Sequence, residues 1–331
     1  MSVLVLNRGG ASGGLKPELT VKAPAGCKID LLRDGLVLKT YTLSENETEH
    51  TFTVSLGAYV VRGSLDGDTK EIDVSIDIVG QYRVEIAFVC NYTMLYDYGD
   101  ECVDVSGGWA VSPFWSNARA FTKNADSLYG SGGGTNNVEY AEYNSAALDL
   151  ADYTKVFLRY KFYTTKDSYK QAAAFNLSLN DGVNARQQIF GRGYNNVTST
   201  INENTYRIIA IPSVSNPCHF EFVLRSAWSS VSSWNAAVFA LALFKEDDIE
   251  ALCAKAGISY PGSLDSLIAS TSSISAILNN EDAIKYMAAN CTGDFMGAFV
   301  TNSACRSALD ASPHRVIVNT NKHWEKFLAM V

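Results

Sequence analysis

The sequence predicts a mostly β chain with a C-terminal α region: two β-sandwich modules followed by short helices. Runs of β-branched and aromatic residues alternate with turn residues as far as residue 245. No strand–helix alternation of the kind that marks a parallel α/β sheet interrupts these runs. Beyond them, apolar residues recur at helical spacing. We therefore expect an N-terminal arm (1–16), two β modules (17–90 and 91–245) and a helical region (246–331).

The N-terminal arm combines two opposing signals. Its glycines, in Arg8-Gly9-Gly10 and Ser12-Gly13-Gly14, favour a flexible segment. The apolar residues Val3, Val5 and Leu6 instead favour a short strand, which we expect to be added to the sheet of a neighbouring molecule. The sequence leaves both possibilities open.

The first β module is predicted from about seven short strands packed into some seventy residues, a density typical of a small sandwich. An Asp-Gly pair at Asp34-Gly35 predicts a tight hairpin, and Asp66-Gly67 predicts another turn. Six of the expected strands have clear sequence signals: 19–23, 28–32, 50–54, 58–62, 70–76 and 81–88.

The second β module has longer strands and longer loops. The loops at 130–137 and 191–196 are rich in glycine and asparagine. Strands joined by long loops predict a jelly-roll β-sandwich. The clearest strand signals lie at 155–163, 206–211, 219–225 and 237–244.

The helical region opens with a helix at 246–256, which has acidic residues in its first turn, Lys255 in its last and Gly257 as its stop. A short repeat follows, in which each unit opens on a polar residue and often closes on Asn or Ser. Ser and Asp are good N-caps at the four clearest starts, and Asn is a tolerable left-handed terminator. Such short helices are not stable alone, so we expect them to stack on each other or on a partner. The units are 273–280, 282–290, 294–302 and 303–310, with degenerate copies at 314–321 and 323–330.

Charge and hydropathy exclude several classes of partner. The formal net charge is −8 and no basic run is present, so neither nucleic acid nor an anionic membrane is an expected ligand. No stretch of about 18 apolar residues predicts membrane insertion. The first residues lack the basic leader of a secretory signal. We expect the chain to be made in the cytoplasm and to leave it by lysis or in a particle.

No catalytic set or cofactor site is predicted. The seven cysteines are odd in number and form no CxxC pair, which favours buried reduced thiols over disulfides or zinc. The four histidines, His50, His219, His314 and His323, are scattered outside any recognisable triad context. The glycine-rich loop at 130–135 lacks the Lys-Ser/Thr ending of a phosphate-binding loop. These observations favour a protein that is not an enzyme and needs no cofactor.

One acidic cluster leaves an alternative open. Asp97, Asp100, Glu101 and Asp104 supply enough oxygens to hold Ca²⁺, although the EF-hand pattern is incomplete. A solvated acidic turn is the favoured interpretation, and we predict no metal site. A pair of carboxylates that would mark a glycoside hydrolase cannot be singled out.

Aromatic residues in polar loops predict a glycan site. A sugar stacks its apolar face on an aromatic ring while amide and guanidinium groups bond its hydroxyls. The candidate glycan-binding residues are Trp228, Trp234, Tyr194, Arg192, Asn195 and Asn196. A core role stays equally open for Trp228, Trp234 and Tyr194, and it is favoured for Trp109 and Trp115.

The order of these modules resembles structural proteins of tailed bacteriophages and prophages of gut Firmicutes. The resemblance lies in the opening Val-Leu-Val-Leu-Asn-Arg-Gly-Gly, the module from Val21 to Val61, and the terminal short repeats. It implies an Ig-like (PEGA-like) module, a carbohydrate-binding-like module, and a virion protein of the tail. The implied partners are other virion proteins, further copies in a trimer or hexamer, and a host-surface glycan. The alternatives are a purely architectural virion protein and an envelope-polysaccharide hydrolase.

Overall fold

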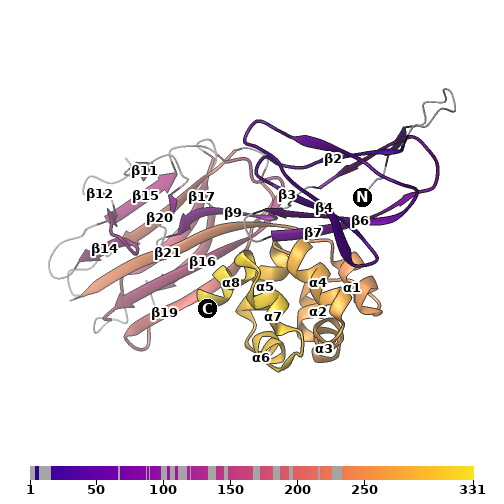
Figure 1. Cartoon of the computed structure of the whole chain (residues 1–331). Coiled ribbons are helices and arrows are strands. Elements are labelled where there is room, and N and C mark those ends of the chain that lie inside the picture. The colour runs from indigo at the N-terminus through magenta and orange to yellow at the C-terminus, as the bar shows by residue number, and fades with distance from the viewer. Residues whose placement is uncertain are drawn as a thin grey trace. The chain divides into compact units, whose positions relative to one another are not determined.

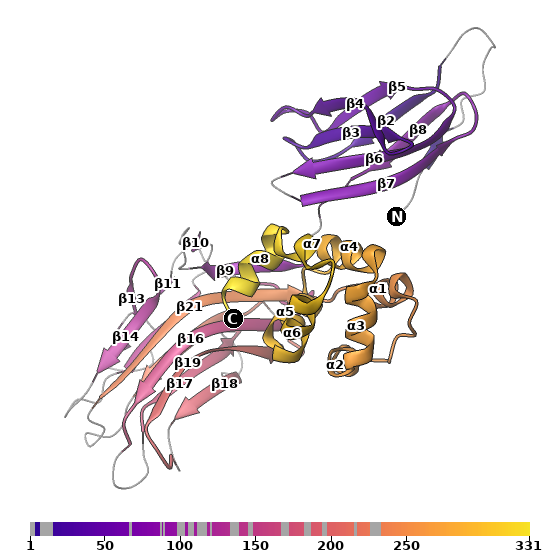
Figure 2. The same cartoon turned by 60° about the horizontal axis from the view of Figure 1, so that its bottom comes forward.

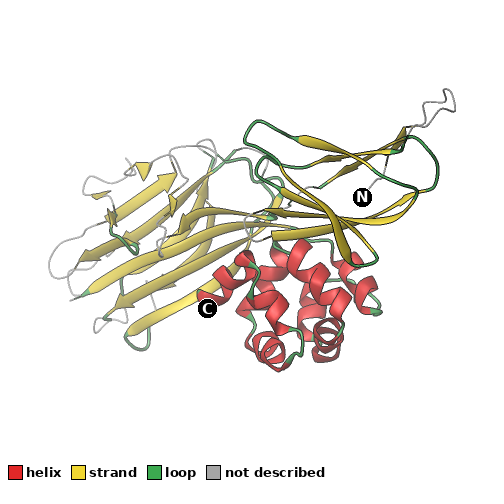
Figure 3. Cartoon of the chain, in the orientation of Figure 1, coloured by secondary structure: helices red, strands yellow, loops and turns green. Residues whose placement is uncertain are grey.

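The computed structural model shows a mostly β chain whose helices all follow residue 245 in the described part, as predicted (Figures 1 and 3). Residue contacts divide the chain into two compact units, Met1–Val89 with Ile317–Glu325, and Cys90–Val316 with Lys326–Val331. The structure describes residues 4–6, 16–65, 68–86, 88, 90–97, 103–104, 109–110, 118–119, 121–132, 139–144, 148–166, 172–181, 187–193, 197–214, 217–225 and 233–331.

The first unit is a β-sandwich of two four-stranded sheets, with strand orders β1-β8-β2-β5 and β4-β3-β6-β7. The seven strands expected after residue 17 are all present as β2 to β8. Leu19, Val21, Ile29 and Val61 lie fully buried between the sheets. Leu19 and Val21 are two residues apart on β2, as expected for side chains on the same face of a strand. The strands are β1 (Leu4–Leu6), β2 (Glu18–Lys22), β3 (Lys28–Arg33), β4 (Leu36–Thr42), β5 (Glu49–Thr53), β6 (Gly57–Leu65), β7 (Asp68–Ile76) and β8 (Gln81–Glu85).

Two local predictions for this unit can be compared with the backbone. The Asp34-Gly35 hairpin is confirmed: both residues have positive φ, 51° and 76°, as a tight turn between β3 and β4 requires. The apolar arm also forms a strand, but not in a neighbour. Leu4–Leu6 pairs antiparallel with β8 of its own chain, where it covers backbone groups that an edge strand would leave unpaired.

The second unit contains a larger sandwich. One sheet is organised around β21 (Trp234–Lys245), which pairs with β16 (Tyr153–Thr164) along one side. On its other side β21 pairs first with β14 (Leu128–Gly132) and then with β9 (Tyr92–Asp97). β19 (Ile201–Ala210) extends this sheet beyond β16, and β10 (Val103–Asp104) and β13 (Thr122–Lys123) lie at its other edges. The predicted loop at 130–137 therefore begins inside a strand.

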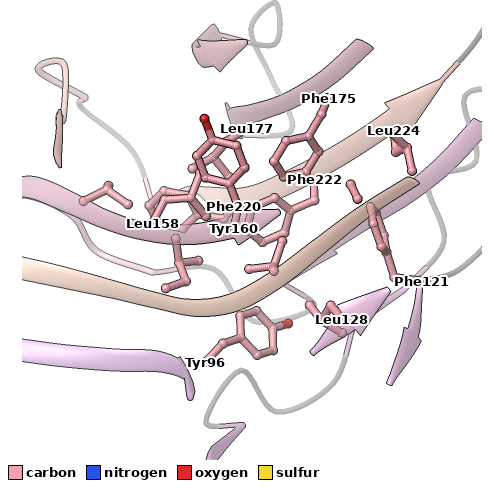
Figure 4. Close-up of a cluster of buried hydrophobic side chains, with 14 of the residues drawn as sticks. Tyr96, Phe121, Leu128, Leu158, Tyr160, Phe175, Leu177, Phe220, Phe222 and Leu224 are labelled. Carbon is pink, nitrogen blue, oxygen red and sulfur yellow. The ribbon is translucent and has the colours of Figure 1, made fainter. Parts of the chain in front are cut away.

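The opposing sheet has the order β11-β15-β20-β17-β18, with β12 beside β15. Its strands are β11 (Trp109–Ala110), β12 (Ala118–Arg119), β15 (Glu139–Asn144), β17 (Ala174–Asn180), β18 (Gln187–Gly193) and β20 (His219–Arg225). Alternate residues of the two sheets meet in one core (Figure 4). There Tyr160 and Leu158 face Phe175, Phe220 and Phe222. Every second residue of β16, β17 and β20, and of β21 on either side of its bulge, thus points inward, which leaves the intervening residues on the outer faces.

Most described cysteines fit the expected buried thiols. Cys27, Cys253, Cys291 and Cys305 are free and buried, Cys218 is buried as well, and Cys90 is exposed. Cys102 lies outside the described residues. No helix in the described part of the chain is long and apolar enough to cross a membrane.

The helical region begins later than its acidic residues predict. The first helix is α1 (Ile249–Ala256), because Asp248 caps it by accepting from the Ala251 N–H, and Gly257 ends it with φ 69°. The remaining helices are α2 (Leu264–Ala269), α3 (Thr271–Asn279), α4 (Glu281–Asn290), α5 (Asp294–Thr301), α6 (Ser303–Ala311), α7 (Arg315–Asn319) and α8 (Lys322–Ala329).

The short units are helices, but the prediction for their asparagines was wrong. Asn280 and Asn302 have φ of −103° and −93°, so neither is a left-handed terminator. Each instead accepts two backbone N–H bonds from the helix that follows it. One asparagine therefore ends one helix and caps the next, which produces a corner without a linker. The helices pack on each other, α1 against α4 and α3 against α6.

Asp247 ties the sandwich to the helices within the second unit. It follows β21, and its carboxylate accepts the Gly293 and Phe295 N–H groups at 2.9 and 3.1 Å and the Asn91 amide at 2.7 Å. The Asp247 N–H donates to the Asp294 carboxylate at 3.0 Å. The N-cap residue of helix α5 is Gly293, which has no side chain to cap the helix, so the remote Asp247 accepts the N–H groups of Gly293 and Phe295.

Helix α5 packs closely on the side of this sheet that points away from the core. A Cβ at Gly297 would lie 2.7 Å from the Phe244 ring and 3.1 Å from Ile208. Phe327 of α8 packs edge-on to Tyr92 and Phe157 at ring distances of 5.0 and 5.3 Å. These helices cover one end of the β21–β16–β19 part of the sheet, while the strands continue past them (Figures 1 and 2).

The first prediction tests this close approach. Gly297→Ala forces the Phe244 ring to move, at a cost of about 1–3 kcal/mol for overpacking, against about 1 kcal/mol gained in helix propensity. We expect a net loss of stability of about 1 kcal/mol in urea unfolding. The exposed Ser307→Ala in α6 is the control, and equal stability of the two variants would contradict the contact.

The second prediction concerns pH. Burial, with the neighbouring Asp294 charge, raises the pKa of Asp247 from 3.8 to about 7. The folded chain then keeps a proton that the unfolded chain has lost. This contribution to stability is complete below pH 3.8 and declines as the pH rises through about 7.

We therefore expect the free energy of unfolding of the parent to fall, relative to Asp247→Asn, from about pH 4 to about pH 7. Urea titrations across this range measure the difference. Parallel stability curves for the two proteins would show that Asp247 does not titrate there.

Candidate binding face of the second sandwich

Most of the predicted glycan residues are not described by the structure. Tyr194, Asn195, Asn196 and Trp228 lie outside the described residues. Arg192 and Trp234 are described, and the structure places them in different environments. For the first four residues the glycan role stays a prediction.

Trp234 is a core residue. It is 1% exposed and belongs to the hydrophobic cluster between the two sheets. Its indole lies against Gly132 of β14, where an added Cβ would come within 2.2 Å of the ring. A ring enclosed on both faces cannot stack on a sugar. The burial therefore contradicts the glycan-stacking role expected for Trp234.

Arg192 holds an edge of the sandwich. Its guanidinium forms a two-pronged ion pair with Glu203 of β19, with the Nε–Oε2 bond at 3.0 Å. The buried Tyr160 hydroxyl donates to the same carboxylate at 2.5 Å. Burial and this bond raise the pKa of Tyr160 to about 12. The cluster joins β18 of one sheet to β19 of the other, and about 40% of the Arg192 side chain stays exposed.

Two residues of the acidic cluster, Asp97 and Asp104, lie in the described part of the chain, on the paired strands β9 and β10. Asp97 is 5% exposed and forms an ion pair with Lys326. Asp100 and Glu101 lie outside the described residues, and Asp104 lies in β10. Within the described part of the chain, no group of three or more Asp, Glu, His or Cys side chains is placed to hold a metal ion.

Among the histidines, His50 has a clear structural place. It stacks on Tyr41 at 3.6 Å and meets Phe52 edge-on at 4.7 Å. Burial lowers its pKa. His219 lies in β20, and His314 and His323 lie in the helical region.

The outer face of the β14–β21–β16–β19 sheet, beyond the helices, is the candidate site. Core-facing residues alternate with outward ones, so Tyr163, Lys161 and Arg159 of β16 all point away from the core. Strand register aligns their neighbours into cross-strand rows. The first row is Ser131, Asn235, Tyr163 and Asn202, and the second is Tyr129, Ala237, Lys161 and Asn204.

A third row brings aromatic rings beside a cation. Arg159 lies 5.3 Å over the ring of Phe239, the extra residue of a β-bulge in β21. Its guanidinium donates to the Asn204 amide oxygen at 2.6 Å. Opposite Arg159 in the register is Tyr206. We call the three rows together the outer face.

The outer face is open to solvent and chemically mixed. Lys161, Asn202 and Asn204 are exposed, and the rings of Tyr129, Tyr163, Phe239 and Tyr206 are partly exposed. Spacings of about 3.4 Å along a strand and about 4.8 Å between strands make it roughly 13 by 14 Å. Flat rings framed by amides and a hydroxyl are what a saccharide needs for stacking and hydrogen bonding.

The glycan site predicted from the sequence does not include this face, because its candidate residues are aromatics in loops. The signal was present in the strands. Lys155-Val-Phe-Leu-Arg-Tyr-Lys-Phe-Tyr163 and Ile201-Asn-Glu-Asn-Thr-Tyr206 both alternate between two sets of residues. Period two identifies the two faces of a strand, but only the packed core shows which of them is left outside.

No protein-family model matches the chain, and no curated protein matches its sequence. Among solved structures, it resembles a mutant of a family 29 carbohydrate-binding module at 6% identity and a TM-score of 0.28, over 46% of this chain and 89% of that one. A β-sandwich carbohydrate-binding module of promiscuous specificity matches at 11% identity and 0.27, over 66% and 85%. An adhesin domain of Lys-gingipain matches at 10% and 0.26, over 47% and 98%. Similarity at these TM-scores transfers no ligand to this chain.

The third prediction compares the contributions of Glu203 and Arg192 to the stability of the cluster that they form with Tyr160. Glu203→Ala leaves the buried Tyr160 hydroxyl and the Arg192 guanidinium without their shared acceptor, so we expect a loss of about 1–3 kcal/mol in urea unfolding. Arg192→Ala removes a half-exposed charge and leaves the Tyr160–Glu203 bond intact, so its loss is smaller. The opposite order would contradict the placement of Glu203 as the centre of the cluster.

Proposed function

We propose that the second sandwich is a non-catalytic glycan-binding module whose ligand lies on the outer face. The observation that carries this proposal is the alignment of aromatic and amide side chains on the solvent-accessible end of one sheet. Ring faces of Tyr163 and Tyr129 would stack on sugar rings, and Asn202 and Asn235 would bond the hydroxyls. A rigid sheet holds these groups in place before binding, so little ordering cost is added.

Arg192 enters this proposal as a positioning residue. It ties β18 to β19 just before Tyr194, Asn195 and Asn196, and those three residues stay candidate ligand contacts together with Trp228. Their contribution is separate from the outer face and is tested with its own variants.

The fourth prediction uses Tyr163→Ala. Loss of a stacking ring from the centre of the face should weaken polysaccharide binding about tenfold or more, equivalent to about 1.4 kcal/mol. Affinity electrophoresis against a panel of neutral and acidic polysaccharides measures retardation of the parent and of each variant. Tyr260→Ala, which removes an exposed ring between α1 and α2, is the matched control.

The alternatives predicted from the sequence are outcomes of the same experiment. Retardation of the parent by none of the polysaccharides would support an architectural protein with no ligand. Release of new reducing ends from a retarding polysaccharide would support a hydrolase. Equal retardation of the parent and Tyr163→Ala would place the binding site elsewhere.

From the sequence resemblance we also propose the setting: a tail-associated virion protein that assembles with its own copies and with other virion proteins. The stacked short helices of the second unit are a surface suited to such assembly. Antibody labelling of purified particles in the electron microscope tests the location. Light scattering of the full chain after size exclusion tests the oligomeric state, and a monomer absent from particles would contradict this setting.

A further inference from the structure

The outer face carries positive charge on an acidic chain. Its rows contain Lys161 and Arg159 and no Asp or Glu, whereas the whole chain has a formal net charge of −8. Glu203, the acidic residue between Asn202 and Asn204, points to the opposite side of the sheet, where Arg192 and Tyr160 bind it. Among the described residues, no carboxylate of the same face therefore neutralises these cations.

In the part of the chain that the structure describes, the partners of Arg159 are neutral. They are the Asn204 amide oxygen at 2.6 Å, the backbone carbonyls of Tyr160 and Thr205, and the ring of Phe239. These contacts fix the guanidinium in place without cancelling its charge.

A second arginine extends the charge toward the helices. Arg306 of α6 donates to the Tyr206 hydroxyl at 3.1 Å and to the Val300 carbonyl, and its guanidinium lies 5.8 Å over the Tyr206 ring. These partners are neutral as well. Arg306, Arg159 and Lys161 thus form a series of cations beside the aromatic rings of the outer face, on which a saccharide chain would stack.

We propose that the outer face binds an acidic polysaccharide, with Lys161 contacting the carboxylate or phosphate of the chain and the tyrosines stacking on its sugar rings. This inference rests on the glycan-binding function proposed above and adds the charge class of its ligand. An exposed lysine contributes through charge more than through one fixed geometry, since an ammonium is a compact charge on a flexible stem. Its contribution must therefore decrease with added salt.

The test compares three probes with the full chain in affinity electrophoresis: polygalacturonate for carboxylate, a phosphomannan for phosphate, and neutral mannan. We expect retardation by at least one acidic probe and weaker or no retardation by mannan. Lys161→Gln should weaken binding of the acidic probe about threefold to fivefold, Lys161→Arg should retain it, and Lys255→Gln in α1 should leave it unchanged. Raising the salt concentration should remove the difference between the parent and Lys161→Gln.

The outcomes are distinguishable. Equal binding of mannan and the acidic probes, with Lys161→Gln unchanged and Tyr163→Ala impaired, would overturn the acidic ligand and leave the glycan-binding function standing. Binding of no probe by the folded parent would overturn both. If Lys255→Gln weakened binding of the acidic probe as much as Lys161→Gln does, the assignment to the outer face would be overturned. Binding would then depend on the net charge of the protein and not on the position of Lys161.

Discussion

The buried Asp247 carboxylate organises the second unit. It lies two residues after the end of the long strand β21 and caps helix α5, whose N-cap residue is a glycine without a capping side chain. Taking this carboxylate out of water is costly, and the Asn91 amide and two helix N–H groups offset that cost. The result is a helix held at one end of the sheet, with Gly297 against Phe244. The position of α5 decides how much of the sheet stays covered and how much stays open.

The open part of that sheet connects the fold to the proposed function. A β-sandwich needs only one face of each sheet for its core, so the outer face can carry polar and aromatic side chains without loss of stability. In β16 the residues Tyr160 and Phe162 close the core while Lys161 and Tyr163 remain outside. The β-bulge at Phe239 places one more ring beside Arg159. Side chains held on a sheet in this way would need no loop movement to contact a ligand together.

Much of the architecture followed from local sequence signals. The strands of the first sandwich and the long strands of the second were predictable because period-two alternation and turn residues are local properties. The short helices were predictable for the same reason. Two details were not: that Asn280 caps the following helix and does not adopt a left-handed conformation, and that β1 pairs with a strand of its own chain. Both depend on the direction the chain takes after the residue, which no local pattern specifies.

The candidate site shows more clearly the difference between what local sequence patterns predict and what the tertiary structure decides. By itself the sequence determined a mostly β chain with C-terminal helices, and it predicted that aromatic and amide side chains would form any glycan site. It did not determine which aromatic rings are accessible, since Trp234 and Tyr163 look alike in a one-dimensional pattern, yet one is 1% exposed and the other lies on the open face. Only the tertiary structure decided this, because exposure depends on which face of each strand meets the opposing sheet and where helix α5 comes to rest.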